Sequence, residues 1–151
     1  MTHNKLKGSQ QKLIAFFNKH GFLNKLTFTG REVLSNKIIG VDISQRKLLL
    51  IEENDNSYHS KIIDLGEVKT CKVKKTYTAI NSNNFKKNRI EEYLNSIALQ
   101  FHFKNEKTPA ALLFNKNKFH DTRVLKKLAN KIKNWECRLS KILIDKEQEA
   151  A

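Results

Sequence analysis

The residues best suited to chemistry are lysines that lie close together in the middle of the chain. One group occupies a predicted strand, a second follows in the next polar segment, and two aromatic residues accompany them. The set comprises Lys69, Lys72, Lys74, Lys75, Lys86, Lys87 and Arg89, with Tyr77 and Phe85 as the aromatic residues. Proteins that bind single-stranded nucleic acid combine a basic groove with aromatic side chains on which bases stack. The pattern is therefore a candidate nucleic-acid site, with a merely solvated charged face as the alternative.

Groups that could transfer protons are scattered through the sequence. His102 belongs to the polar face of a predicted strand, and Asp42 and Asp64 belong to neighbouring predicted strands. General acid–base catalysis needs two such groups to face one cleft, and nothing in the sequence brings these carboxylates together. His120 could pair with Asp121, but Asp121 is also a good cap for the helix that follows. We interpret these residues as structural or solvent-facing.

Motifs of the common enzyme classes are missing. The sequence has no nucleotide-binding glycine loop, zinc-protease helix, Cys-x-x-Cys pair or Gly-x-Ser-x-Gly turn. Cys71 and Cys137 are far apart, and neither has a second cysteine or a histidine at metal-ligand spacing. The sequence therefore predicts a non-enzymatic protein with no cofactor and no metal. It also predicts two reduced, buried thiols, with a disulfide as the alternative.

Length and charge restrict the class of protein. The 151 residues suit one ordinary domain, and 39% hydrophobic residues with nine phenylalanines exclude a disordered chain. The net charge of +14 favours an anionic partner such as nucleic acid or an anionic membrane surface. Only five of the 29 basic residues are arginine, so codon bias in an AT-rich genome is the competing explanation of the charge.

The compartment follows from the N-terminal segment and the cysteines. The first apolar run, residues 13–17, is too short for a signal peptide or a membrane span. Two well-separated cysteines are typical of a reducing compartment. The sequence therefore predicts a cytoplasmic protein.

The elements that position the candidate residues can be predicted from hydrophobic periodicity. A short helix is expected over 10–20, where Leu13 and Phe17 share one face. Gly21 suits the left-handed residue that ends a helix. The pattern leaves open whether this helix packs on the domain or projects from it.

From about residue 26 to residue 114 the hydrophobic period changes to two, which predicts an antiparallel meander. The strand at 39–43 is expected to bury one face. The other strands are expected at 47–52, 58–65, 68–77, 97–104 and 110–114. Turns are expected at 44–46 and 54–57, and a long polar loop at 78–89.

The last element is a helix from 121 to about 144, with a fraying tail at 145–151. Its apolar residues form one stripe, namely Leu125, Leu128, Ile132, Trp135, Leu139 and Ile142. A stripe of this length predicts a helix that packs on its own sheet, and a coiled-coil partner helix is the alternative.

This order of antiparallel strands closed by one long amphipathic helix resembles that of the bacterial pleckstrin-homology-like (PH-like) and GRAM-like families. The resemblance rests on 39–42 (Ile-Gly-Val-Asp), 47–51 (Lys-Leu-Leu-Leu-Ile) and 62–68 (Ile-Ile-Asp-Leu-Gly-Glu-Val), which look like the early hairpin and the next strand. It implies an α+β fold in which a bent antiparallel sheet forms a partly open barrel, capped by the C-terminal helix.

The resemblance also implies a domain organisation and a function. Residues 1–25 form a tail with a short helix, 26–144 form the PH-like domain, and 145–151 form a frayed tail. The phosphoinositide signature of the family is not met, because Arg46 and Lys47 lack its spacing. The expected function is therefore a binding or scaffold module for an acidic protein surface or an anionic lipid headgroup. A nucleic-acid binder is the alternative, and a small enzyme with an unrecognised site is a second one.

Overall fold

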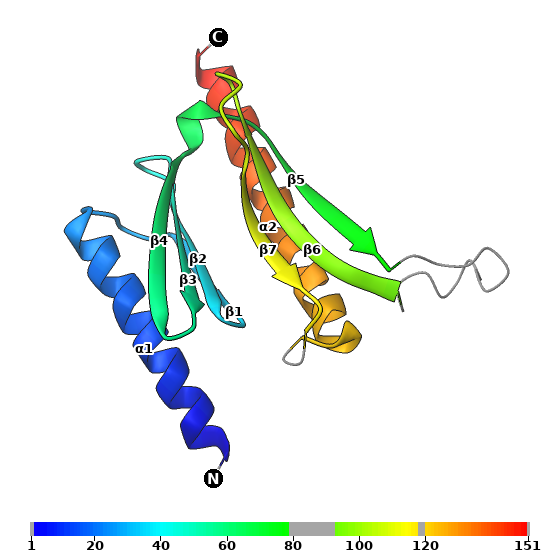
Figure 1. The fold of residues 1–151 in the computed structure, drawn as a ribbon. Helices are drawn as coiled ribbons and strands as arrows, with labels where there is room; N and C mark the ends of the chain where they lie inside the picture. The colour runs from blue at the N-terminus through cyan, green and yellow to red at the C-terminus, as the bar shows by residue number, and fades with distance from the viewer. Residues whose placement is uncertain (1, 79–92, 118–119, 151) are drawn as a thin grey trace, which may run out of the picture. The chain divides into compact units, whose positions relative to one another are not determined.

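The chain folds into helices and antiparallel strands that form two compact units (Figure 1). The computed structural model describes residues 2–78, 93–117 and 120–150. The N-terminal unit is Met1–Gly66 and the C-terminal unit is Glu67–Ala151. In chain order the elements are α1 (Thr2–Leu23), β1 (Gly30–Leu34), β2 (Lys37–Asp42), β3 (Lys47–Asn54), β4 (Ser57–Asp64), a 3-10 turn (Leu65–Glu67), β5 (Val68–Tyr77), β6 (Leu94–Phe103), β7 (Ala110–Asn115) and α2 (Thr122–Ala150).

The strands form one sheet in each unit. The N-terminal unit has the order β1-β2-β3-β4 and the C-terminal unit the order β5-β6-β7, with all neighbours antiparallel. The predicted α+β class, the antiparallel strands and the long C-terminal helix are therefore confirmed. Neither sheet closes on itself into a barrel.

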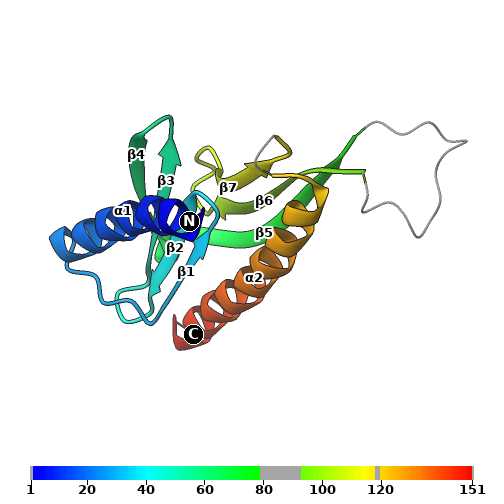
Figure 2. The ribbon, with the colours of Figure 1, turned by 90° about the horizontal axis from the view of Figure 1, so that it is seen from below.

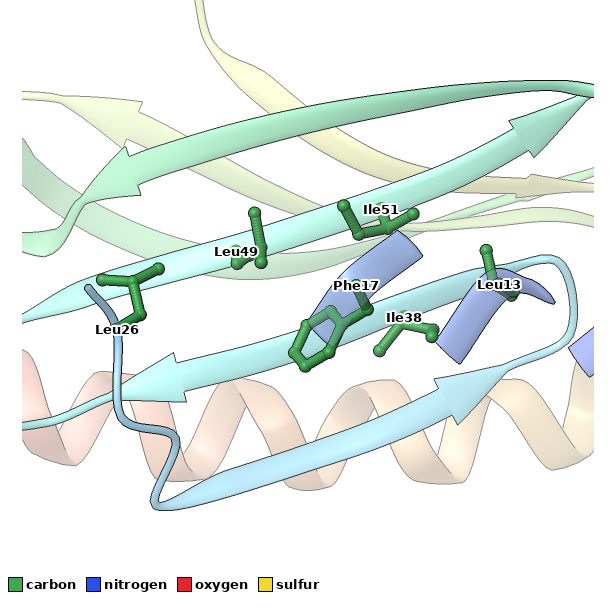
Figure 3. Close-up of a cluster of buried hydrophobic side chains, with 6 residues drawn as sticks. All are labelled: Leu13, Phe17, Leu26, Ile38, Leu49 and Ile51. Atoms are coloured by element: carbon green, nitrogen blue, oxygen red, sulfur yellow. The ribbon is translucent and has the colours of Figure 1, made fainter. Parts of the chain in front are cut away.

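In the N-terminal unit, α1 packs across one face of the sheet (Figure 2). Its residues Leu13 and Phe17 are buried against side chains from the loop after the helix and from β2 and β3. The buried cluster comprises Leu13, Phe17, Leu26, Ile38, Leu49 and Ile51 (Figure 3). The segment for which a helix was expected, residues 10–20, therefore packs on the folded unit through Leu13 and Phe17.

The helix can approach β2 closely because residue 40 is glycine. A Cβ atom on Gly40 would lie 2.4 Å from Cζ of Phe17 and 2.9 Å from Cδ1 of Phe28, which is far inside van der Waals contact. The rings of Phe17 and Phe28, with centroids 4.5 Å apart, fill this space. Every residue of β2 is buried, so the prediction that this strand buries only one face is wrong. Ile43 lies beyond the end of the strand and is exposed.

The end of α1 also differs from the prediction. The helix begins at Thr2 and ends at Leu23, so it is longer than expected at both ends. The left-handed residue is Lys25, with φ 56°, and not Gly21. The N–H groups of Leu26 and Lys25 donate to the carbonyls of Gly21 (2.9 Å) and Phe22 (3.1 Å), which is a Schellman motif. Gly21 instead leaves room for the ring of Phe28, as a Cβ would lie 2.6 Å from its Cε2.

In the C-terminal unit, α2 packs on β5 and β6. Asp121 accepts a hydrogen bond from the N–H of Val124 at 2.9 Å, so the predicted N-cap is confirmed. The stripe is buried from Leu125 to Leu139 at the predicted positions. The helix therefore packs on its own sheet, and its apolar stripe is not left exposed for a coiled-coil partner. It continues to Ala150, beyond the predicted stripe.

Candidate functional site

The positive charge is unevenly divided between the two units. The N-terminal unit has a net charge of +4 and the C-terminal unit a net charge of +10. Helix α2 exposes seven basic side chains, namely Arg123, Lys126, Lys127, Lys131, Lys133, Arg138 and Lys141. Between residues 122 and 144 the sequence has a single acidic residue, Glu136. The C-terminal unit therefore attracts anionic groups more strongly than the N-terminal unit does.

Strand β5 carries four of the predicted site residues, and all four are exposed: Lys69, Lys72, Lys74 and Lys75. Lys72 lies opposite Gln100 and Lys74 opposite Ala98, so these two lysines share one face of the sheet. Lys75 lies opposite Ile97, on the face that also carries Cys71. The strand therefore distributes its lysines over both faces of the sheet.

Of the remaining predicted site residues, the structure describes only Tyr77, which lies on β5 with these lysines. Phe85, Lys86, Lys87 and Arg89 lie outside the described residues. Tyr77 is half-buried at the end of β5. The stacking of nucleic-acid bases on Tyr77 and Phe85 stays a prediction.

A shallow groove of about 200 Å³ lies between β5 and α2. Its walls come from consecutive residues of β5 and from the last turns of α2, and they are Lys69, Thr70, Cys71, Lys72, Ser140, Leu143 and Ile144. Cys71 and Leu143 are buried, whereas Lys69, Lys72 and Ile144 are exposed. The groove thus combines apolar side chains with a lysine rim. Its volume is below the roughly 300–1,000 Å³ of most small-molecule sites and suits a single side chain.

Glu136 connects α2 to the edge of β5 that pairs with no other described strand. Its carboxylate accepts hydrogen bonds from the N–H of Val73 and from Nζ of Lys133, both at 2.5 Å. Because β5 is an outer strand among the described residues, the N–H of Val73 has no strand on that side to bond to. The carboxylate of Glu136 accepts its hydrogen bond instead. Partial burial acts to raise the pKa of Glu136, but these hydrogen bonds and the charges of Lys133 and Lys72 outweigh it and hold the pKa below its ordinary value.

Asp42 is fully buried and has a structural role. Its carboxylate accepts hydrogen bonds from the N–H of Thr27 (2.8 Å), the hydroxyl of Ser44 (2.7 Å), and the N–H and side-chain amide of Gln45 (3.0 and 2.9 Å). Burial acts to raise the pKa of Asp42, but these donors together lower it below its ordinary value. The amide of Gln45 also donates to the carbonyl of Lys25 at 2.6 Å. Asp42 therefore joins the loop after α1 to the turn after β2.

Asp64 and Asp121 also accept hydrogen bonds from backbone N–H groups of the fold. Asp64 accepts a hydrogen bond from the N–H of Gly66 at 2.8 Å. His102 is half-buried on the strand face predicted for it, and His120 is buried beside the start of α2, which Asp121 caps. In the part of the chain that the structure describes, no cluster of three or more His, Cys, Asp or Glu residues could hold a metal ion. None of the described helices is long and apolar enough to cross a membrane.

The two thiols lie in different surroundings. Both are free, but only Cys71 is buried, so the prediction that Cys137 is buried is wrong. Burial, with the nearby carboxylate of Glu136, raises the pKa of Cys71 to about 12. We expect Cys137 to react with Ellman's reagent at mildly alkaline pH, whereas Cys71 reacts only after unfolding, because the thiolate is the nucleophile. A Cys137→Ser variant that still reacted rapidly in its native state would contradict this assignment.

No family model, no curated protein and no solved structure matches the chain. The resemblance to PH-like domains therefore stays a prediction.

Proposed function

We propose that the protein is a non-enzymatic binding module of the cytoplasm, and that it binds an acidic protein segment in the groove between β5 and α2. The observation that carries the proposal is the composition of this groove, in which the lysine side chains of one strand lie beside apolar residues of a basic helix. The element order also supports it, because two antiparallel sheets followed by one long helix agree with the order expected of a PH-like domain.

The partner's charge follows from that of the groove. Lys69 and Lys72 are exposed at the rim, and the surrounding unit has a net charge of +10. Such a surface attracts carboxylates over a distance of about a Debye length and accelerates their association. An acidic segment therefore arrives faster and is retained better than a neutral one.

The volume of the groove limits what the partner inserts. A space of about 200 Å³ beside Leu143 and Ile144 accepts one apolar side chain, and burial of its apolar surface contributes about 25 cal/mol per Å². We therefore expect a segment in which an apolar residue is flanked by aspartate or glutamate.

A nucleic-acid partner is the second candidate. It requires the lysines and the aromatic side chains of Tyr77 and Phe85 to follow one strand of nucleic acid. Because β5 sends Lys72 and Lys75 to opposite faces, the described part of that surface is less continuous than the groove. The observations favour the protein partner.

The test uses a short fluorescein-labelled peptide that alternates glutamate with leucine, and measures its binding to the full chain by fluorescence anisotropy. The double variant Lys69→Glu/Lys72→Glu is expected to bind about tenfold more weakly or worse. The matched control is Lys104→Glu/Lys116→Glu, which makes the same charge change at exposed positions of the same unit.

The two variants separate a local site from general attraction. If both weaken binding equally, net charge rather than the groove is responsible and the proposal fails. If labelled oligothymidylate binds more tightly than the peptide, with a log–log salt slope of about −0.7 per phosphate contact, the nucleic-acid candidate is correct.

A further inference from the structure

Large apolar side chains are exposed at one end of the N-terminal unit. Phe22 is 83% exposed and Leu23, its neighbour at the end of α1, is 63% exposed. Ile43, in the turn between β2 and β3, is 45% exposed. Single exposed apolar residues are common on soluble proteins, but adjacent bulky ones at these exposures indicate an interaction site. We call Phe22, Leu23 and Ile43 the apolar tip.

Hydrogen bonds hold the two parts of the apolar tip together. The Schellman motif ends α1 directly after Leu23. The next residues are fastened to the turn that carries Ile43, because Gln45 donates to the carbonyl of Lys25 and Asp42 accepts from the N–H of Thr27. Figure 1 shows the end of α1 and the turn between β2 and β3 at the same end of this unit. The apolar tip is thus preorganised.

The charged residues closest in sequence to Phe22 and Leu23 are basic, although the exposed Asp64 lies opposite Lys47, beside the turn that carries Ile43. The sequence contains no acidic residue before Glu32. Lys19 lies about one turn before Phe22 and Leu23 on α1, and Lys25 lies in the loop just after them, and both are exposed. Long lysine side chains can keep their charges at the level of lipid headgroups while neighbouring apolar residues insert more deeply.

We propose that the apolar tip inserts into the surface of an anionic lipid bilayer, with Lys19 and Lys25 in contact with its headgroups. The exposed area of three side chains amounts to a few hundred Å², well below the roughly 800 Å² that each partner buries in a stable protein complex. Shallow insertion into a bilayer requires no such area, because acidic lipids add their attraction for the lysines. This binding is independent of the groove between β5 and α2.

The test measures co-sedimentation of the full chain with vesicles of phosphatidylcholine, with and without phosphatidylserine. The wild-type protein is expected to bind only the vesicles that contain phosphatidylserine. The variant Phe22→Ser/Leu23→Ser is expected to lower the partition coefficient by about tenfold, and Lys19→Glu/Lys25→Glu should also lower it. The control is Leu113→Ser, which removes an apolar side chain that is 44% exposed from β7 of the C-terminal unit.

Insertion itself is measured with Phe22→Trp, whose emission should shift to the blue when phosphatidylserine vesicles are added. The proposal is overturned if the wild type does not bind these vesicles, if Phe22→Ser/Leu23→Ser binds as well as the wild type, or if that variant instead abolishes self-association of the chain. Phe22→Ser/Leu23→Ser should still bind the acidic peptide with wild-type affinity. Loss of vesicle binding and loss of peptide binding in the groove are therefore distinguishable.

Discussion

Replacing Trp135 with alanine is expected to lower the free energy of unfolding by about 3–5 kcal/mol, the usual cost of deleting a buried aromatic side chain. Trp135 is 1% exposed and lies in the middle of the apolar stripe of α2. The substitution also removes the ring beneath the guanidinium of Arg138, which lies 4.5 Å from its centroid. The measurement is urea unfolding followed by far-UV circular dichroism, because the variant lacks the chain's only tryptophan.

The matched control for this experiment is Asn134→Ala. Asn134 is the exposed neighbour of Trp135 on the same helix, so its replacement should change the unfolding free energy by less than about 0.5 kcal/mol. If Trp135→Ala itself costs less than about 1 kcal/mol, the ring does not support the core and α2 becomes a candidate partner helix again.

Replacing Asp42 with alanine is expected to cost about 3 kcal/mol or more. The substitution leaves the N–H of Thr27, the hydroxyl of Ser44 and both donors of Gln45 without their common acceptor, and hydrogen bonds to charged groups are worth about 1.5–3 kcal/mol each. The cost is below the sum of these values, because the turn can rearrange so that some of the released donors form hydrogen bonds with water. Urea unfolding at neutral pH measures it.

The pH dependence of Asp42→Asn shows whether the charge of Asp42 is responsible. The folded state holds the pKa of Asp42 below its ordinary value of 3.8. Its ionised form therefore contributes stability above the unfolded-state pKa, and this contribution disappears as the pH falls through the lower folded-state pKa. The wild type should be more stable than Asp42→Asn at neutral pH, and the difference should shrink in strong acid. A difference independent of pH would contradict this explanation.

Much of the fold could be predicted because its signals are local. The turn at 54–57 has Asp55 and Asn56 with φ of 47° and 65°, a conformation that these two residue types tolerate well. Strand β6 buries Ile97, Leu99 and Phe101, although Ala98 between them is buried too, and α2 buries the stripe from Leu125 to Leu139 that its spacing defines. Strand β1 was not predicted as a separate strand, because an outer strand with partly exposed residues has a weak pattern.

The candidate site could be predicted only on its β5 side. Lys69 and Lys72 follow from the sequence, but the residues opposite them, Ser140 and Leu143, lie far along the chain on a different element. Which side of α2 faces β5 depends on how the whole helix packs, and no local pattern determines this. Glu136 was missed for the same reason, since its bond to Val73 spans 63 residues.

The lysines of β5 also affect how copies of the chain behave towards one another. An outer strand can act as a template on which a second molecule adds its own strand, and such growth leads to fibrils. Like charges on two approaching copies of β5 repel, and the Glu136 carboxylate already occupies the N–H of Val73. Acetylation or a bound polyanion would cancel that repulsion, so we expect the solubility of the protein to depend on the same side chains that we propose bind an acidic segment.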